Sequence, residues 1–200
     1  HSFPTRRSSD LPGSFAPVVT VASIENARNG ANGNYKMSDF SSWGVSPDMR
    51  LKPEVTAPGG NIYSSVPGGG YKMMSGTSMA TPQMTGASAV VLERVQNDPL
   101  FSSLNDRQKV DVVQNLIMGT AVPVVDPGQG GGAYYSPRKQ GAGLVNVQAA
   151  TTTGVYPTVN GATDASRPKA DLGDGTKGWH FDVTLHNLSG TAATYDLSAQ

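Results

Sequence analysis

Residues 75–95 limit the possible folds of this chain more than any other stretch. They read SGTSMATPQMTGASAVVLERV, so turn formers and hydroxyl residues lead into a helical pattern. Four small residues lie along that pattern, at Ala80, Gly86, Ala87 and Ala89. A helix with so thin a side can lie close against a sheet. We therefore expect a buried central helix from about Thr77 to Val95.

Short apolar runs predict the strands of that sheet. APVVTVASI, residues 16–24, is almost unbroken and rich in β-branched residues, which is typical of a strand covered on both faces in a parallel sheet. EVTAP (54–58) and NIYSSV (61–66) are two further strand candidates, separated by Gly59-Gly60. Strands that alternate with helices indicate an α/β domain with a parallel sheet.

A second helix and a last packed segment complete this domain. The second helix is predicted over residues 106–120, with Asn105 or Asp106 as its N-cap. Its apolar residues at helical spacing are Val110, Val113, Leu116 and Ile117. GAGLVNVQAA, residues 141–150, is the last packed segment, and the threonines that follow mark a boundary. We place this domain at residues 14–152.

The apolar period changes after that boundary. Phe181, Val183 and Leu185 alternate with polar residues, which predicts a strand with one wet face and leaves His180 and His186 facing solvent. TYDLSA, residues 194–199, repeats the alternation. We expect residues 153–200 to open an antiparallel β-sandwich that packs poorly, because a few strands cannot bury both faces.

The first 13 residues, HSFPTRRSSDLPG, are expected to be a non-native leader that is not part of the fold. They begin with His1, and the Arg6-Arg7 pair lacks the apolar run that an export signal requires. They resemble translated adaptor sequence more than native protein. With a sandwich cut at Gln200, we expect the chain to be a fragment at both ends.

Composition excludes several classes of function. Fifteen basic residues balance 15 acidic ones in a chain of 200, without the basic cluster of a nucleic-acid-binding protein. The absence of cysteine excludes disulfides and thiolate metal sites. The sequence has no run of about 18 apolar residues, the length that a helix needs to cross a membrane. What remains is a folded, water-soluble domain.

Ser78 is the candidate catalytic residue. Serine and threonine at a helix start are often plain N-caps. A hydroxyl there can also act as a nucleophile, because the free N–H groups of a helix N-terminus stabilise a developing oxyanion. Serine becomes a good nucleophile only when a neighbouring base removes its proton and a carboxylate orients that base. Ser78 therefore needs two partners.

Three ordered motifs resemble those of the subtilisin family of serine peptidases. They are FSSWGVSPDMRLKPEVTAPGG, MMSGTSMATPQMTGASAVVLE and QGAGLVNVQAA, and the likeness spans residues 14–152. The sequence of these motifs is most similar to cell-envelope subtilases of the lactocepin type, which carry fibronectin-like sandwiches after the peptidase domain. The resemblance implies the C-terminal half of a subtilisin-like fold followed by a fibronectin type III-like sandwich. It also implies a cis bond at Ala16-Pro17.

The resemblance assigns roles around Ser78. Ser78 would be the nucleophile, and its backbone N–H would serve the oxyanion site. Gly76 would let the backbone approach the substrate, Thr77 would line the oxyanion site, and Met79 would pack behind the nucleophile. The implied activity is that of a secreted serine endopeptidase acting on polypeptides. The resemblance also suggests attachment to the cell wall through sequence beyond Gln200.

The partners of Ser78 are not visible in this sequence. In subtilisin itself the order is Asp, His, Ser, so both would precede residue 78. His1, His180 and His186 lack the family's setting for the base, and the oxyanion asparagine upstream of APVVTV is missing as well. The 200 residues alone are therefore expected to be inactive. The alternative is a non-catalytic pseudo-peptidase or a surface-binding scaffold module.

Other features favour structural roles. GQGGGAYYSPRKQGAG, residues 128–143, lacks the ending of a phosphate loop and is expected to be a flexible surface loop. Asp171 and Asp174 break the spacing of a calcium loop and favour a hairpin turn. Met73 and Met74 are expected to fill the core. Calcium is common in the family, but these residues do not locate a site, and no cofactor is predicted.

Overall fold

The parallel pair of strands that the sequence predicts lies at the centre of the molecule. The computed structural model describes residues 13, 15, 18–26, 35–45, 50–160, 167–170, 178 and 180–198. Strands β1 (Val21–Glu25) and β4 (Val55–Gly60) pair in parallel, with Val21 opposite Val55. Two short strands, β2 (Gly44–Val45) and β3 (Leu51–Lys52), pair antiparallel beside them. Parallel pairing confirms the interpretation of APVVTVASI and EVTAP.

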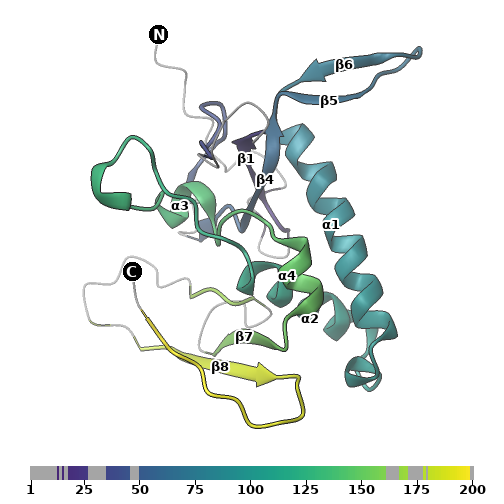
Figure 1. The fold of residues 1–200 in the computed structure, drawn as a ribbon, viewed down its shortest axis with the longest axis vertical. Helices are drawn as coiled ribbons and strands as arrows, with labels where there is room; N and C mark the ends of the chain where they lie inside the picture. Colours follow the sequence, from purple (N-terminus) through teal and green to yellow (C-terminus); the bar gives the residue numbers. More distant parts are fainter. Residues whose placement is uncertain are drawn as a thin grey trace.

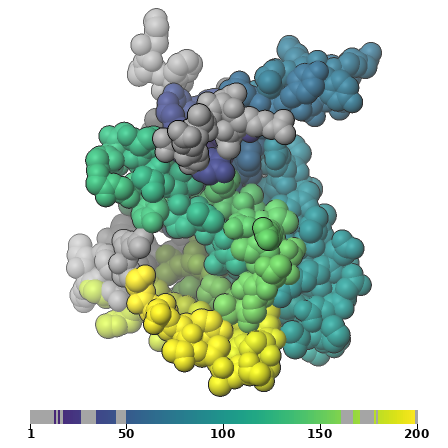
Figure 2. All heavy atoms as spheres, viewed as in Figure 1, coloured from purple at the N-terminus to yellow at the C-terminus, as the bar shows by residue number. Residues whose placement is uncertain are grey.

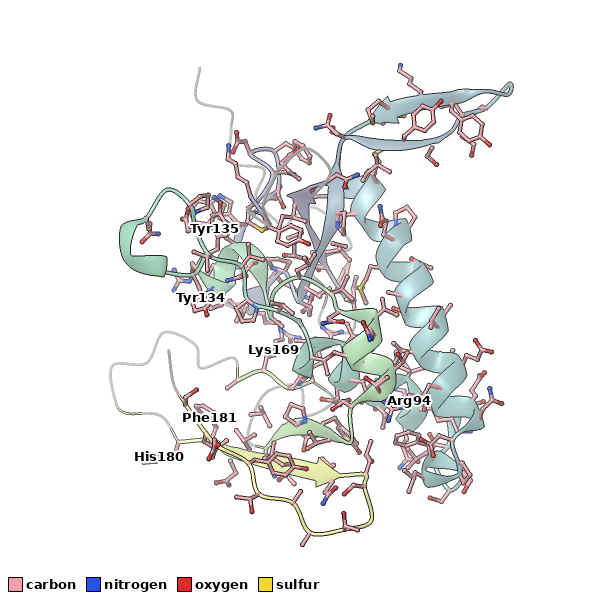
Figure 3. All side chains as sticks on the ribbon, viewed as in Figure 1. Arg94, Tyr134, Tyr135, Lys169, His180 and Phe181 are labelled. Atoms are coloured by element: carbon pink, nitrogen blue, oxygen red, sulfur yellow. The ribbon has the colours of Figure 1, made fainter. Side chains whose placement is uncertain are left out.

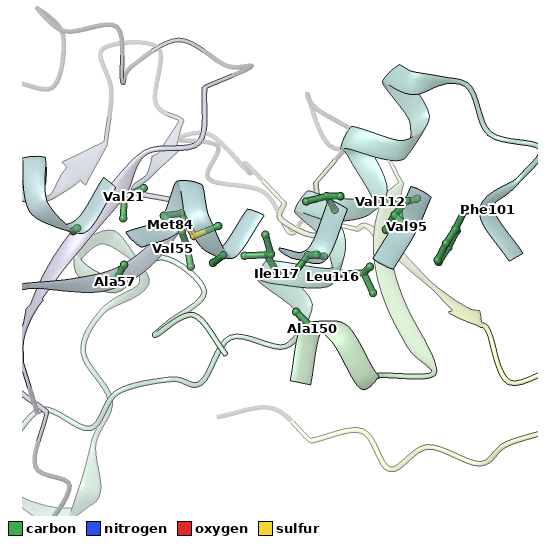
Figure 4. Close-up of a cluster of buried hydrophobic side chains, with 14 residues drawn as sticks. Val21, Val55, Ala57, Met84, Val95, Phe101, Val112, Leu116, Ile117 and Ala150 are labelled. Carbon is green, nitrogen blue, oxygen red and sulfur yellow. The ribbon is translucent and has the colours of Figure 1, made fainter. Parts of the chain in front are cut away.

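Helix α1 (Thr77–Asn97) runs along one side of this pair, as Figure 1 shows. Small and branched side chains from one face of the helix are buried: Ala80, Met84, Ala87, Val91 and Val95. Figure 4 shows them in one cluster with side chains of β4 and of the second helix. The helix is confirmed, but it is buried along one face only, because Gly86, Ala89 and Val90 are exposed.

Helix α2 (Asp106–Gly119) starts with a complete capping box. The Asn105 side chain accepts from the Gln108 N–H, and the Gln108 side chain accepts from the Asn105 N–H, both at 3.0 Å. Asn105 is therefore the N-cap. Val113, Leu116 and Ile117 are buried as expected, whereas Val110 is exposed. A single-turn helix, η4 (Pro99–Phe101), connects α1 to α2.

The last packed segment forms helix α4 (Val147–Thr152), capped by Asn146. Between α2 and α4 lie η5 (Gly130–Gly132) and α3 (Pro137–Gln140). The prediction of a flexible surface loop over residues 128–143 is wrong for residues 135–140, since Tyr135 and Gln140 are buried. The Gln140 side chain accepts from the Val124 N–H at 2.7 Å, so it anchors this loop to the domain.

Strands β5 (Ile62–Ser65) and β6 (Tyr71–Met74) form an antiparallel hairpin that projects from the body (Figure 1). The strand predicted from NIYSSV is confirmed. The prediction that Met73 and Met74 fill the core is wrong, because both side chains are exposed. The turn formers that precede residue 75 belong to this hairpin and not to the core.

Strands β7 (Val155–Asn160) and β8 (Asp182–Asn187) pair antiparallel. β8 confirms the strand predicted around Val183, but its apolar side chains are exposed. His186 is not solvent-facing, since it stacks on Tyr156 at 4.5 Å and its Nε2 lies 2.9 Å from Thr158 Oγ1. The second strand is not formed over the described residues 194–198.

The segment after residue 152 packs more tightly at its start than expected. Pro157 of β7 lies against α2, where a Cβ on Gly119 would come within 2.6 Å of the proline ring. Val159 and Arg167 are buried. Poor packing is therefore wrong for these residues, whereas residues 181–198 are mostly exposed. The boundary after residue 152 and the sandwich stay predictions.

A buried charge cluster forms at the start of β4. The Glu54 carboxylate contacts Lys52 at 2.7 Å, Arg167 at 2.8 Å and Lys169 at 3.0 Å, and it accepts from the Thr20 N–H at 2.7 Å. The four charged side chains are only 0–9% exposed. Burial lowers the pKa of Lys52, while its ion pair with Glu54 acts in the opposite direction. We name these four residues the Glu54 cluster; the sequence analysis did not single them out.

Three features named in the sequence lie outside the described residues: the predicted cis bond at Ala16-Pro17, the Arg6-Arg7 pair and the Asp171/Asp174 turn. A cis bond is present at Lys52-Pro53.

Among the described residues, the helices lack a stretch with the length and apolar character of a membrane span.

Candidate active site

The carboxyl ends of β1 and β4 lie beside the start of α1. In open α/β sheets, ligands bind outside the carboxyl ends of the strands. The Gly76 N–H donates to the Gly59 carbonyl at 2.8 Å, so the end of β4 holds the residue that precedes the helix. This contact is close: a Cβ on Gly59 would come within 2.5 Å of Ser23 Oγ and 2.6 Å of the Gly76 carbonyl oxygen.

The site requires a glycine at position 59 rather than at position 76, the glycine that the resemblance singles out. The backbone of Gly76 is extended, and a Cβ there would meet only ordinary contacts, the nearest being Met79 sulfur at 3.4 Å. Gly59 is the position that no side chain can share. The dipeptide Gly59-Gly60 was visible in the sequence, but only as a separator between two strands.

The hydroxyls before Ser78 do not cap the helix. The N-cap is Gly76, and it makes no side-chain capping bond. The Ser75 hydroxyl instead accepts from the Asn61 N–H at 2.8 Å. The Thr77 carbonyl accepts from the Thr81 hydroxyl at 2.9 Å. The plain N-cap interpretation of Ser75, Thr77 and Ser78 is therefore wrong.

Ser78 occupies the second position of α1 and is exposed. Its hydroxyl makes no hydrogen bond with any residue that the structure describes. The N–H groups of Thr77 and Ser78 cannot have helical acceptors, because they lie in the first turn. The helix dipole adds partial positive charge at the same point. An exposed hydroxyl beside free donors supplies two of the parts that acyl transfer needs, an accessible oxygen and donors for an oxyanion.

Asn61 connects the surrounding segments. It is a non-glycine residue with a φ of +53°, in the left-handed region. Its N–H bonds to Ser75, and its side-chain amide donates to the Glu25 carboxylate at 3.3 Å. The ends of β1 and β4 are thereby joined to the turn before Ser78. Sequence reasoning missed Asn61, although its position directly after Gly59-Gly60 was a signal.

Met79 follows Ser78 and is half-buried, with its sulfur next to Gly76. It lies at the start of α1, beside Ser78, the residue behind which the resemblance expects it to pack. Thr77 is half-buried at the first helical position. The structure thus brings Gly76, Thr77, Ser78 and Met79 into one turn, and their catalytic roles stay predictions.

Neither described histidine is near this turn. Figure 3 places His180 beside Phe181, far from the start of α1, and His186 lies on β8 against Tyr156. No imidazole or carboxylate in the described part of the chain hydrogen-bonds to Ser78. Nor does any group of three His, Asp or Glu residues there form a site for a cation. Calcium is also bound by backbone and amide carbonyl oxygens, so the calcium that the resemblance suggests stays an expectation without an assigned site.

Comparison with known proteins decides the family. The subtilase family model matches residues 2–159, which is more than half of the chain. The chain belongs to the subtilase family. Its α/β fold is the subtilisin-like one that the motifs indicate.

Curated relatives agree with this assignment. The chain is 32% identical over 154 residues to the C5a peptidase of Streptococcus pyogenes, which covers 77% of this chain and 13% of that protein. It is 33% identical over 192 residues to the PIII-type proteinase of Lactococcus lactis subsp. cremoris (strain SK11), covering 93% of this chain and 10% of that protein. The chain thus spans only about a tenth of the relatives it matches.

A solved structure supports the fold. The patellamide maturation protease PatA superposes with a TM-score of 0.51 at 29% identity, covering 71% of this chain and 44% of PatA. Both the sequence relatives and this structural neighbour are proteases by name. The family resemblance that the sequence motifs indicated is confirmed.

Proposed function

We propose that this chain is the nucleophile-bearing half of a serine endopeptidase domain. Ser78 attacks a peptide carbonyl, a histidine supplied by other sequence takes its proton and returns it to the leaving amine, and water then releases the acyl-enzyme. The observation that carries the proposal is the exposed, unbonded hydroxyl of Ser78 at the second position of α1, beside free N–H groups.

The chain's own residues have three tasks in this mechanism. The Ser78 hydroxyl forms the bond to the acyl group. The Ser78 N–H, next to that of Thr77, stabilises the oxyanion in a position where the helix dipole favours negative charge. Gly59 and Asn61 hold the turn at Ser75-Gly76, so that the hydroxyl stays exposed.

The proposal extends to substrate and location. Polypeptides are the substrate class, and no nucleic acid is expected to bind a chain without net charge. The relatives are a peptidase and a proteinase by name, which supports proteolysis. The proposed location, extracellular and at the cell envelope, comes from the resemblance of the motifs to cell-envelope subtilases. Residues 153–200 would begin the fibronectin-like sandwich that follows the peptidase domain.

A fluorophosphonate probe tests the proposal. Two preparations are treated: the 200-residue chain, and the longer polypeptide that carries it together with the expected Asp and His. Mass analysis of the peptides then locates the label. We expect the longer polypeptide to be labelled at Ser78 and the 200 residues alone to stay unlabelled, because they lack a base.

Two outcomes would reject it. Label at another serine would show that the nucleophile is misassigned. A longer polypeptide that contains no base and takes up no label would be a pseudo-peptidase or a scaffold module, the competing class of function.

A further inference from the structure

The β5–β6 hairpin has an exposed apolar face. The strand register places Tyr63 opposite Met73, and Tyr71 opposite Ser65. Because side chains alternate along a strand, Tyr63, Tyr71 and Met73 lie on the same face. They are 67%, 67% and 53% exposed, and the two tyrosine rings stack at 5.5 Å. Figure 2 shows the hairpin standing clear of the rest of the molecule.

Such a face is unusual for an isolated surface loop. Tyrosine and methionine are enriched where proteins contact one another, because they supply large apolar area with adaptable or polar edges. Lys72 is the only charged residue between Asn61 and Met74. The face would therefore favour an apolar or aromatic partner.

The hairpin that carries this face leads directly into the candidate active site. β6 ends at Met74, and the chain passes through Ser75 and Gly76 into α1, whose second residue is Ser78. At about 3.3 Å per residue, Tyr71 lies about 13 Å along the backbone from Ser75. An extended polypeptide would span that distance with about four residues. In the described part of the chain, β5 is the only strand that pairs with β6, so one edge of β6 is open.

We infer that the face formed by Tyr63, Tyr71 and Met73 is an exosite for the polypeptide substrate. It holds an apolar or aromatic side chain at least four residues away from the bond that Ser78 cleaves, because Ser78 lies beyond Ser75. The open edge of β6 offers backbone hydrogen bonds to the same segment, as in peptides that add a strand to a sheet. This inference rests on the proposed function of Ser78.

The size of the face favours a substrate over a second copy of the chain. Two aromatic side chains bury at most about 500 Å². A stable protein–protein interface needs roughly 800 Å² on each partner. A weak contact with an extended chain, released after each turnover, fits the smaller area.

The test uses the longer polypeptide and two nested fluorogenic peptides. Both share the residues around the cleaved bond; the long peptide adds four residues on each side, including Phe and Leu. The variant is Tyr63→Ser/Tyr71→Ser. The matched control is Tyr134→Ser/Tyr195→Ser, which replaces two exposed tyrosines elsewhere on the surface.

We expect kcat/KM of the variant to fall about tenfold on the long peptide and to stay unchanged on the short one, the size expected for two aromatic contacts. The control should match wild type on both peptides. The rate of fluorophosphonate labelling at Ser78 should be unchanged, because the probe does not reach the hairpin.

Equal loss on both peptides, or no loss on either, would overturn the exosite while leaving Ser78 as the nucleophile. A wild-type dimer that the double variant dissociates in sedimentation velocity would assign the face to a second copy instead. If the wild type takes no label at Ser78, the proposed function fails, and the exosite fails with it.

Discussion

The two ends of β4 differ in almost every physical respect. At its carboxyl end, Gly59 holds the turn before Ser78, and the hydroxyl there is exposed and unbonded to any described residue. At its other end, the Glu54 cluster buries one carboxylate among three cations. The first end presents the candidate nucleophile to solvent, and the second joins segments more than 100 residues apart in the sequence.

The difference separates what catalysis needs from what folding needs. A nucleophile must stay accessible, so it contributes few contacts to stability. A buried carboxylate must be fully paired, because an uncompensated buried charge is strongly destabilising. Substitutions at the two ends should therefore affect activity and stability in opposite proportions, and four predictions test this.

The largest effect is expected from Ser78→Ala in the longer polypeptide. Activity should fall about 10⁶-fold, the loss measured in subtilisin itself when its serine is removed. The free energy of unfolding should change by less than about 0.5 kcal/mol, as for other surface substitutions. Peptide hydrolysis and urea unfolding measure the two quantities. A large loss of stability would show that the hydroxyl has a structural role.

Glu54→Gln should show the reverse. It keeps the shape of the side chain but leaves Lys52, Arg167 and Lys169 without their carboxylate. The free energy of unfolding should fall by about 3–5 kcal/mol, the usual cost of removing one partner from a buried ion pair. Urea unfolding measures it, and Glu93→Gln on the exposed side of α1 is the control.

The labelling rate at Ser78 per folded molecule should be unchanged in Glu54→Gln. Slower labelling of the folded fraction would mean that the two ends of β4 are coupled. In that case the contrast between them would be lost.

Gly59→Ala should affect both properties. The added Cβ would come within 2.6 Å of the Gly76 carbonyl oxygen, so the start of α1 must move. Overpacking of this kind costs about 1–3 kcal/mol. Labelling at Ser78 should slow beyond the loss of folded protein, since the N–H groups proposed to stabilise the oxyanion move with the turn. Gly86→Ala, where a Cβ meets nothing within 4 Å, is the control and should label like wild type.

The smallest effect is the contribution of Lys52 to the pH dependence of the free energy of unfolding. In the folded state, burial lowers the pKa of Lys52 below its ordinary value of 10.5. As the pH rises from that lowered pKa toward 10.5, the unfolded chain holds more protons than the folded one, so stability rises with pH. Lys52→Met should remove this contribution, which is read as the difference between two urea-unfolding series. Parallel series for both proteins would contradict it.

Much of the fold could be predicted from local patterns. The α1 and α2 helices and the strands around Val55 and Val183 are confirmed, because apolar periodicity and capping residues act over short distances. Burial was harder to predict. Met73 and Met74 are apolar yet exposed, since the hairpin that carries them projects from the body.

By itself, the sequence determined the family and the candidate nucleophile, because GTSMATP is a local motif that runs from the N-cap of α1 through its first two turns. Only the tertiary structure decided which glycine the turn requires, that Asn61 joins it to Glu25, and that Glu54 meets Arg167 and Lys169. The side-chain contacts among these join residues 36 to 115 positions apart, and no spacing in the sequence encodes them. The physical reason is that a buried charge or a close backbone contact depends on the folded path of the whole chain, whereas a helix start depends on its nearest neighbours.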